Sequence, residues 1–127
     1  MNLLDILNRI AQVIYDKKGL NILALDVKGL STITDYLIIA EGNVDRHVTA
    51  IGKAIVDELD KIGEDPIHTE GFQTGDWVVL DYGWCIIHIF MPGMREKYSL
   101  ERLCKEAQIV DLVIETDLTT EPQRGDR

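Results

Sequence analysis

Apolar residues recur at helical spacing in two segments of the chain. The first predicts an amphipathic helix from Leu3 to Lys18. Its expected buried stripe is Leu3, Leu7, Ile10, Ala11 and Ile14. The second predicts a helix from Val44 to Lys61, with Asn43 as its N-cap and Gly63 beyond its end. Its expected stripe is Val48, Ile51, Ile55, Leu59 and Ile62.

Short apolar runs bounded by turn residues predict strands. Asn21–Val27 and Tyr36–Ala40 are rich in isoleucine, leucine and valine, and both lie between clusters of glycine and polar residues. The first run is almost continuously apolar, which indicates a position well inside a sheet. A short third strand is expected over Ile67–Glu70, after Pro66.

The segment from Gly75 to Phe90 predicts a β-hairpin. Its strands would be Asp76–Leu80 and Cys85–Phe90, with Leu80 opposite Cys85 and four residues in the turn. In that register one face is wholly apolar: Val78, Leu80, Cys85, Ile87 and Ile89. The other face mixes aromatic and polar side chains: Trp77, Val79, Ile86, His88 and Phe90, with Asp81 and Trp84 at the turn. The first face is expected to pack in the hydrophobic core. The second either packs beneath a helix, which is commoner, or serves as a binding surface.

Beyond the hairpin the pattern is less regular. The break at Met91-Pro92-Gly93 ends the last strand, and a helix is expected from Met94 to about Glu106. The apolar run Gln108–Ile114 is compatible with a helix or a strand. The polar residues 116–127 are expected to fray.

The order of these elements predicts an α/β (α+β) fold. We expect one mixed β-sheet of about five strands flanked by helices, because sheets and helices bury their apolar faces against each other. Strands separated by the long helix can run parallel through a right-handed crossover. The 127 residues suffice for one domain, and neither a repeat nor a linker divides them.

The charge of the chain limits its partners. It carries 22 acidic and 13 basic residues, a net charge of −9. Proteins that neutralise phosphates are basic, so little direct nucleic-acid contact is expected, and a basic protein partner suits the surface better. No run approaches the roughly 20 apolar residues that cross a bilayer, and no leader pattern begins the chain. We therefore expect a cytoplasmic protein without membrane contact.

The histidines and cysteines form no recognised motif. His47, His68 and His88 have no second histidine or cysteine at metal-ligand spacing, so neither a metal nor a cofactor is expected. Cys85 and Cys104 form no CxxC pair, and we expect two reduced thiols.

Acidic residues at strand ends are the remaining candidates for catalysis. Asp26, Asp35 and Asp81 lie where active-site carboxylates often gather. Strand-end acids more often cap turns, however, and no motif of this chain requires an enzyme. We therefore expect no catalytic residues.

Three stretches of the chain together resemble one family. They are LDVKGLSTITDYLIIAEGNVDRHVTAI from Leu25 to Ile51, GDWVVLDYG followed by IIHIF, and REKYSLERL from Arg95 to Leu103. In order and spacing they resemble the Iojap/YbeB family, the ribosomal silencing factors (RsfS). On this basis we expect an Iojap/RsfS domain over residues 1–106, with a nucleotidyltransferase-like shape, and a partly disordered C-terminal extension over residues 107–127.

The resemblance implies a non-enzymatic repressor of translation. Such factors dock on the large ribosomal subunit through a ribosomal protein of the L-fourteen family, at the face that the small subunit joins. Occupying that face blocks subunit joining when nutrients are short. Isolated members form dimers, so the free protein can be a homodimer.

The matched positions also imply a partner-binding surface. It comprises Trp77, Asp81, Tyr82, His88, Phe90, Arg95, Tyr98 and Leu100. Trp77 and Tyr98 are expected to be aromatic anchors, and Asp81 a charge partner for a lysine or arginine. Phe90 and Leu100 are nearly as compatible with a core position.

Two other functions remain open at this point. One is a nucleotidyltransferase-like, metal-dependent enzyme that uses Asp26, Asp35 or Asp81. The other is a self-associating module whose aromatic face is buried in a homodimer. The chain also departs from the family pattern: Cys104 stands where a tryptophan is usual, and Trp84 where the turn commonly has aspartate.

Overall fold

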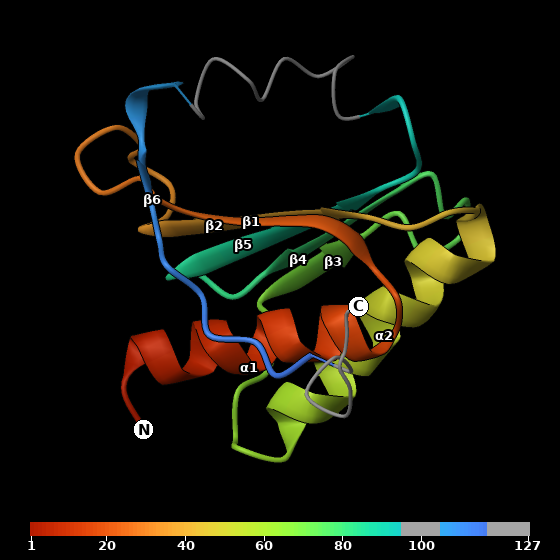
Figure 1. Cartoon of the computed structure of the whole chain (residues 1–127), viewed down its shortest axis with the longest axis horizontal. Helices are drawn as coiled ribbons and strands as arrows, with labels where there is room; N and C mark the ends of the chain where they lie inside the picture. Colours follow the sequence, from red (N-terminus) through yellow and green to blue (C-terminus); the bar gives the residue numbers. More distant parts are fainter. Residues whose placement is uncertain (95–104, 117–127) are drawn as a thin grey trace, which may run out of the picture.

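The computed structural model of the chain describes residues 1–94 and 105–116. Two helices, α1 (Leu3–Asp16) and α2 (Asp45–Asp60), cover one face of a six-stranded sheet (Figure 1). The strands are β1 (Leu20–Asp26), β2 (Tyr36–Glu41), β3 (His68–Glu70), β4 (Trp77–Asp81), β5 (Cys85–Phe90) and β6 (Gln108–Ile109). The predicted fold class is confirmed. The sixth strand comes from the run whose pattern did not separate helix from strand.

The sheet is mixed, with strand order β3-β4-β5-β2-β1-β6. The β2–β5 pair is parallel and every other pair is antiparallel. Helix α2 lies between β2 and β5 in the chain, so the predicted parallel pairing across the long helix is confirmed. β5 and β2 lie at the centre of the sheet, with the hairpin partner β4 on one side and β1 on the other.

Both helices pack an apolar stripe against the sheet. The buried residues of α1 are Ile6, Leu7, Ile10, Ala11 and Ile14, and those of α2 are Val48, Ile51, Gly52, Ile55 and Leu59. The prediction for Leu3 was wrong. Its side chain is 42% exposed in the first turn, which Asn2 caps, and Ile6 occupies the buried position instead. Ile62 lies beyond the helix end and is only partly buried.

The start of α2 differs from the prediction. Val44, not Asn43, is the N-cap residue, and no side chain caps the helix there. The backbone N–H of Asn43 instead donates to Nδ1 of His47 over 2.8 Å. Nε2 of His47 then donates to the carbonyl oxygen of Lys17 over 2.6 Å. The imidazole thus satisfies a backbone donor before α2 and ties this turn to the end of α1.

The hairpin has the predicted faces but a different register. Leu80 pairs with Ile87 instead of Cys85. The backbone N–H of Tyr82 donates to the Cys85 carbonyl over 2.9 Å, which leaves only Gly83 and Trp84 in the turn. Gly83 has a φ of +85°, as a type II′ turn requires at its first central residue. Because the register moved by two residues, the strand side chains kept their predicted faces. The prediction for Trp84 was wrong, because it packs on the helical side of the sheet and not at the end of the mixed face.

The segment after β6 crosses from the sheet to α1 (Figure 1). β6 pairs with the edge of β1, and the backbone N–H of Val113 donates to Oδ1 of Asn8 over 2.8 Å. The side-chain amide of Gln12 donates to the Glu115 carbonyl over 2.9 Å and accepts from the Glu115 N–H over 2.7 Å. We call residues 110–116 the strap. The predicted helix from Met94 to Glu106 and the frayed end lie mostly outside the described residues.

Candidate partner-binding site

The mixed aromatic face of the hairpin lies on the side of the sheet opposite α1 and α2. Trp77, Ile86 and Phe90 belong to a cluster with β1 and β2 residues that contains no residue of either helix. Val78, Leu80 and Ile87 belong to the other cluster, together with both helices. The two-residue alternation of the strands therefore separates a helix-covered core from a second face. The candidate site lies on that second face.

Three rings form a stacked group on this face. Trp77 of β4 lies opposite Phe90 of β5, with ring centroids 5.3 Å apart and planes inclined by 23°. His88 lies two residues before Phe90, and their rings are 5.8 Å apart and almost parallel at 5°. Trp77 and His88 are also stacked, at 5.8 Å and 28°. We call these three residues the ring cluster.

One hydrogen bond fixes the orientation of the ring cluster. Nε1 of Trp77 donates to Nδ1 of His88 over 3.0 Å. Nδ1 can accept only when it carries no proton, so the bond requires a neutral imidazole. Burial lowers the pKa of His88 to about 4, which keeps the imidazole neutral near pH 7. The ring cluster is therefore uncharged under ordinary conditions.

The structure divides the predicted site residues into three groups. Trp77, His88 and Asp81 are partly exposed, and Oδ1 of Asp81 accepts the Gly83 N–H over 2.8 Å. Phe90 is fully buried beneath the other two rings, and Tyr82 is 5% exposed on the helical side of the sheet. Phe90 therefore supports the ring cluster from inside, whereas Tyr82 lies on the other side of the sheet and is not brought together with the ring cluster. The third group, Arg95, Tyr98 and Leu100, lies outside the described residues, and partner binding by the whole set stays a prediction.

Two of the three strand-end acids, Asp26 and Asp81, form local turn contacts through their carboxylates. Asp26 accepts the backbone N–H of Lys28 over 3.0 Å, and its other oxygen lies 3.6 Å from Nζ of the same lysine. Asp81 accepts from the turn, as described above. Among residues 1–94 and 105–116, no three His, Cys, Asp or Glu side chains are grouped so that they could hold a metal ion. These acids therefore give no support to metal-dependent catalysis.

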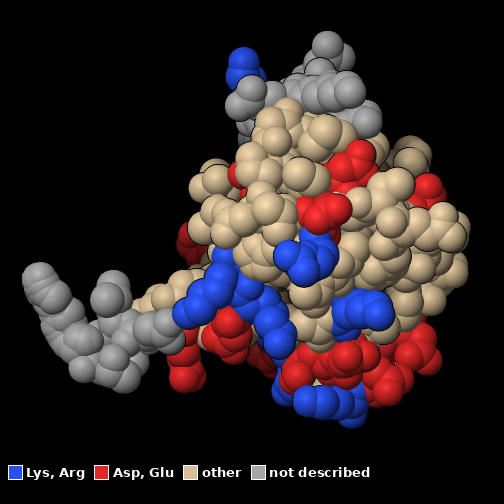
Figure 2. Space-filling view, turned by 90° about the vertical axis from the view of Figure 1, so that its right-hand side faces the viewer, with Lys and Arg blue, Asp and Glu red and all other residues tan. Residues whose placement is uncertain are grey.

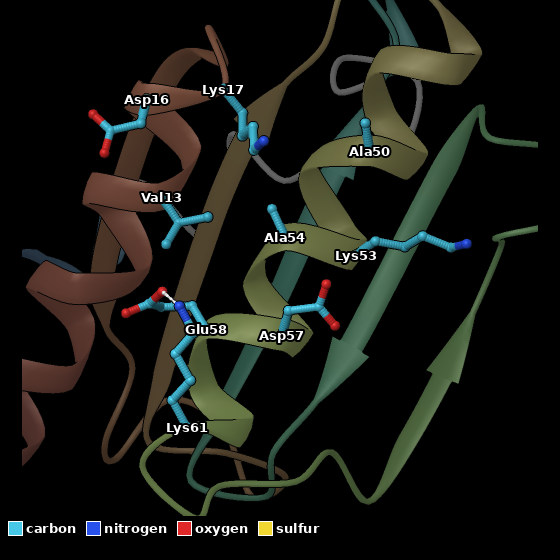
Figure 3. A pocket seen from close by; sticks show the side chains of 9 residues that line it. All are labelled: Val13, Asp16, Lys17, Ala50, Lys53, Ala54, Asp57, Glu58 and Lys61. Carbon is cyan, nitrogen blue, oxygen red and sulfur yellow. Dashed lines mark hydrogen bonds and ion pairs between the residues drawn. The ribbon is translucent and has the colours of Figure 1, made fainter.

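A groove of about 510 Å³ lies between α1 and α2, and the sequence analysis missed it (Figure 3). Val13, Ala50 and Ala54 form its apolar part. Its charged residues are balanced between three acids and three lysines: Asp16, Asp57, Glu58, Lys17, Lys53 and Lys61. The alanines at four-residue spacing in α2 are the signal that could have revealed it. Its balanced charge favours neither an anionic nor a cationic ligand.

Charges of both signs are mixed over the helical side of the molecule. Figure 2 shows lysine and arginine side chains beside aspartate and glutamate side chains across its lower half. Glu58 illustrates the mixing, because it pairs with Arg9 over 2.8 Å and with Lys61 over 3.2 Å. Among the described residues, no helix is long and apolar enough to span a membrane.

The comparisons with known proteins identify the family. Residues 1–127 match the family model described as "Ribosomal silencing factor during starvation". The chain belongs to the RsfS family. The match confirms the resemblance inferred from the three motifs and extends it beyond Leu103, to the end of the chain.

Individual RsfS relatives cover most of the chain. The ribosomal silencing factor RsfS of Bacillus subtilis is 39% identical over 112 residues, which are 88% of this chain and 95% of that protein. The mouse protein called "Mitochondrial assembly of ribosomal large subunit protein 1" is 29% identical over 100 residues, which are 76% of this chain and 44% of that protein. A crystal structure from Chromobacterium violaceum has a TM-score of 0.78 at 27% identity, and the match covers 92% of this chain and 97% of the other.

Proposed function

We propose that this RsfS-family chain binds the large ribosomal subunit through a ribosomal protein of the L-fourteen family and thereby blocks joining of the small subunit. Membership of the family supports ribosome silencing as the general role. The name of the mouse relative, which refers to the large ribosomal subunit, supports that subunit as the partner. The observation that carries the proposal is the ring cluster on the face of the sheet opposite α1 and α2.

The ring cluster has the properties of an interface anchor. The indole of Trp77 is partly exposed, and it is held by a hydrogen bond to His88 and by stacking on the buried Phe90. A ring fixed before binding loses little conformational entropy in the complex. Because His88 is neutral, covering it with a partner does not require an imidazolium charge to be desolvated. Tryptophan anchors of this kind often dominate the binding energy of an interface.

The charge of the chain favours a basic protein partner. Its net charge of −9 would attract a lysine- or arginine-rich surface during encounter and would repel exposed phosphates. Asp81 lies on the same face as Trp77, at the turn end of β4, where it could meet a cationic side chain at the edge of the contact. We therefore assign Trp77 to the centre of the interface and Asp81 to its rim.

The proposed mechanism is steric. The factor and the small subunit compete for one face of the large subunit, so inhibition follows the fraction of large subunits that carry the factor. This mechanism needs no bond-making step, no cofactor and no metal. The strand-end acids fit this account, since Asp26 and Asp81 make turn contacts.

Co-sedimentation with purified large subunits tests the proposal. We expect Trp77→Ala to weaken binding by about 30-fold, the effect of losing roughly 2 kcal/mol at an anchor. Tyr15→Ala is the matched control, because it also truncates a partly buried aromatic ring, but on α1. Equal binding by wild type and Trp77→Ala would contradict the proposed anchor. Light scattering of the free protein shows whether it self-associates.

A further inference from the structure

We propose that the chain carries a second docking surface, at the β4–β5 turn, and that this surface takes a basic polypeptide segment with an apolar side chain. We call it the turn-edge surface and define it by Glu64, Asp65, Ile67, Tyr82 and Trp84. It lies on the helical side of the sheet, whereas the ring cluster lies on the other side. The inference therefore stands apart from the proposed function.

The turn brings three segments of the chain together. The carbonyl of Trp84 accepts the backbone N–H groups of Asp35 and Tyr36 over 3.3 and 3.1 Å. Its indole Nε1 donates to a carboxylate oxygen of Glu64 over 3.3 Å. Ile67 lies against Gly83, since a β-carbon added to Gly83 would come within 2.9 Å of the Ile67 side chain. The loop before β2, the turn and the segment before β3 thus meet at one end of the sheet, on the left of Figure 1.

The turn-edge surface offers apolar area to solvent. Ile67 is 73% exposed and lies against Gly83, the residue before the partly exposed Trp84. In the loop that ends against Trp84, Ile33 is 74% exposed. Single exposed aliphatic residues are ordinary on protein surfaces, but exposed apolar residues gathered at one end of a sheet are typical of contact surfaces. An apolar side chain of a partner would gain most by covering Ile67.

Tyr82 supplies an independent sign of a missing partner. Tyr82 is only 5% exposed, and its hydroxyl has no hydrogen-bond partner among the described residues. Burial raises the pKa of Tyr82 to about 12, and the nearby carboxylates of Asp65 and Glu64 contribute to the same shift. The hydroxyl therefore stays protonated and can donate. A buried donor without an acceptor is rare in folded proteins, and because the hydroxyl oxygen is inaccessible in the free chain, a bound segment could supply the acceptor only by opening the turn as it binds.

The charges of the turn-edge surface select the occupant. Glu64 and Asp65 place two carboxylates beside the apolar area, and none of the five defining residues is basic. A lysine or arginine next to an apolar side chain would complement both features. A second copy of the chain would bring the same acids and a further net charge of −9. RNA would place its phosphates against these carboxylates, and the like charges would repel each other. A basic polypeptide therefore fits the turn-edge surface best.

A titration of the ¹⁵N-labelled protein, followed by NMR, tests the inference. The probe is a decapeptide of lysines with two central leucines, and decaglutamate is the negative probe. We expect saturable shifts confined to the amides of Glu64, Asp65, Ile67 and residues 82–84 with the basic peptide, and none with decaglutamate. Binding should weaken as added salt screens the exposed charges.

Variants distinguish peptide binding at the turn-edge surface from non-specific attraction of the peptide to an acidic protein. Asp65→Asn should weaken peptide binding about fivefold, the order expected for one exposed ion pair. Ile67→Lys should abolish binding, because it removes apolar area and adds a repelling charge. Val113→Lys is the matched control, since Val113 is 71% exposed, close to the 73% of Ile67, but lies in the strap. Tyr82→Phe should weaken binding without changing the spectrum elsewhere.

Three outcomes would overturn the inference. They are shifts spread over the acidic surface without saturation, equal losses from Ile67→Lys and Val113→Lys, and shifts centred on the ring cluster. The spectra themselves report whether each variant is folded. Trp77→Ala should retain peptide binding while its binding to large subunits weakens, so failure of this inference and failure of the proposed function give different results.

Discussion

The indole of Trp77 and the imidazole of His88 act as one unit on the face of the sheet opposite α1 and α2. They lie on neighbouring strands, joined by a 3.0 Å hydrogen bond from Nε1 to Nδ1 and stacked at 5.8 Å. The bond exists only while the imidazole is neutral. Protonation of His88 would remove the acceptor, place a charge in a buried site and release the indole from its fixed orientation.

Stability should therefore depend on pH through His88. Its folded pKa is about 4, below the ordinary value of 6.5, so between these values the unfolded chain binds the extra proton and folding loses free energy as pH falls. The contribution is complete above about pH 6.5 and lost as pH falls through 4, and it amounts to at most about 3 kcal/mol.

Urea unfolding from pH 7 to pH 4 measures this dependence. His88→Asn is the comparison, because its amide oxygen can accept the indole N–H and does not titrate. We expect the free energy of unfolding of the wild type to fall more steeply with decreasing pH than that of the variant. Parallel profiles would show that His88 is not the group responsible.

Removing the hydroxyl of Tyr82 should not destabilise the protein. The hydroxyl has no partner among the described residues, and a buried unsatisfied group costs about 1–3 kcal/mol. Tyr82→Phe should therefore leave the free energy of unfolding unchanged or raise it by about 1 kcal/mol. Tyr36→Phe is the control, since the Tyr36 hydroxyl accepts from Nζ of Lys28 over 2.9 Å. A clear loss of stability in Tyr82→Phe would show that the hydroxyl is satisfied.

The side chains of Asn8 and Gln12 should hold the strap to α1. Gln12→Ala removes both hydrogen bonds to Glu115, each worth about 1 kcal/mol. We expect faster hydrogen exchange at the amides of Val113 and Glu115 and little change in β5. Gln73→Ala, an exposed glutamine in a loop, is the control. Unchanged exchange in the strap of Gln12→Ala would mean that apolar packing alone holds it.

The sequence predicted the faces of the hairpin better than its pairing. Strand alternation places His88 and Phe90 on one face, and Trp77 joins them in any register that differs from the predicted one by an even number of residues. The register depends on the turn, and the two-residue turn at Gly83 and Trp84 looked like a four-residue loop because Asp81 and Tyr82 also suit turns. A shift by one residue would have destroyed the prediction, and the actual shift of two did not.

Contacts between distant segments were beyond the sequence analysis. The strap is extended because Asn8 and Gln12 bind its backbone, and these residues lie more than 100 positions away. The same holds for His47, whose bond to Lys17 fixes the start of α2. Burial of Tyr82 on the helical side likewise depends on packing across elements. Periodicity predicts which residues face a core, but not which polar groups meet.

A subunit-joining assay tests the central claim most directly. Purified large subunits are incubated with the protein, small subunits are then added, and light scattering follows their association. The account predicts that joining falls in proportion to the bound protein, that adding the protein after joining has little immediate effect, and that Trp77→Ala restores joining. Normal joining at protein concentrations that saturate the large subunit would contradict it.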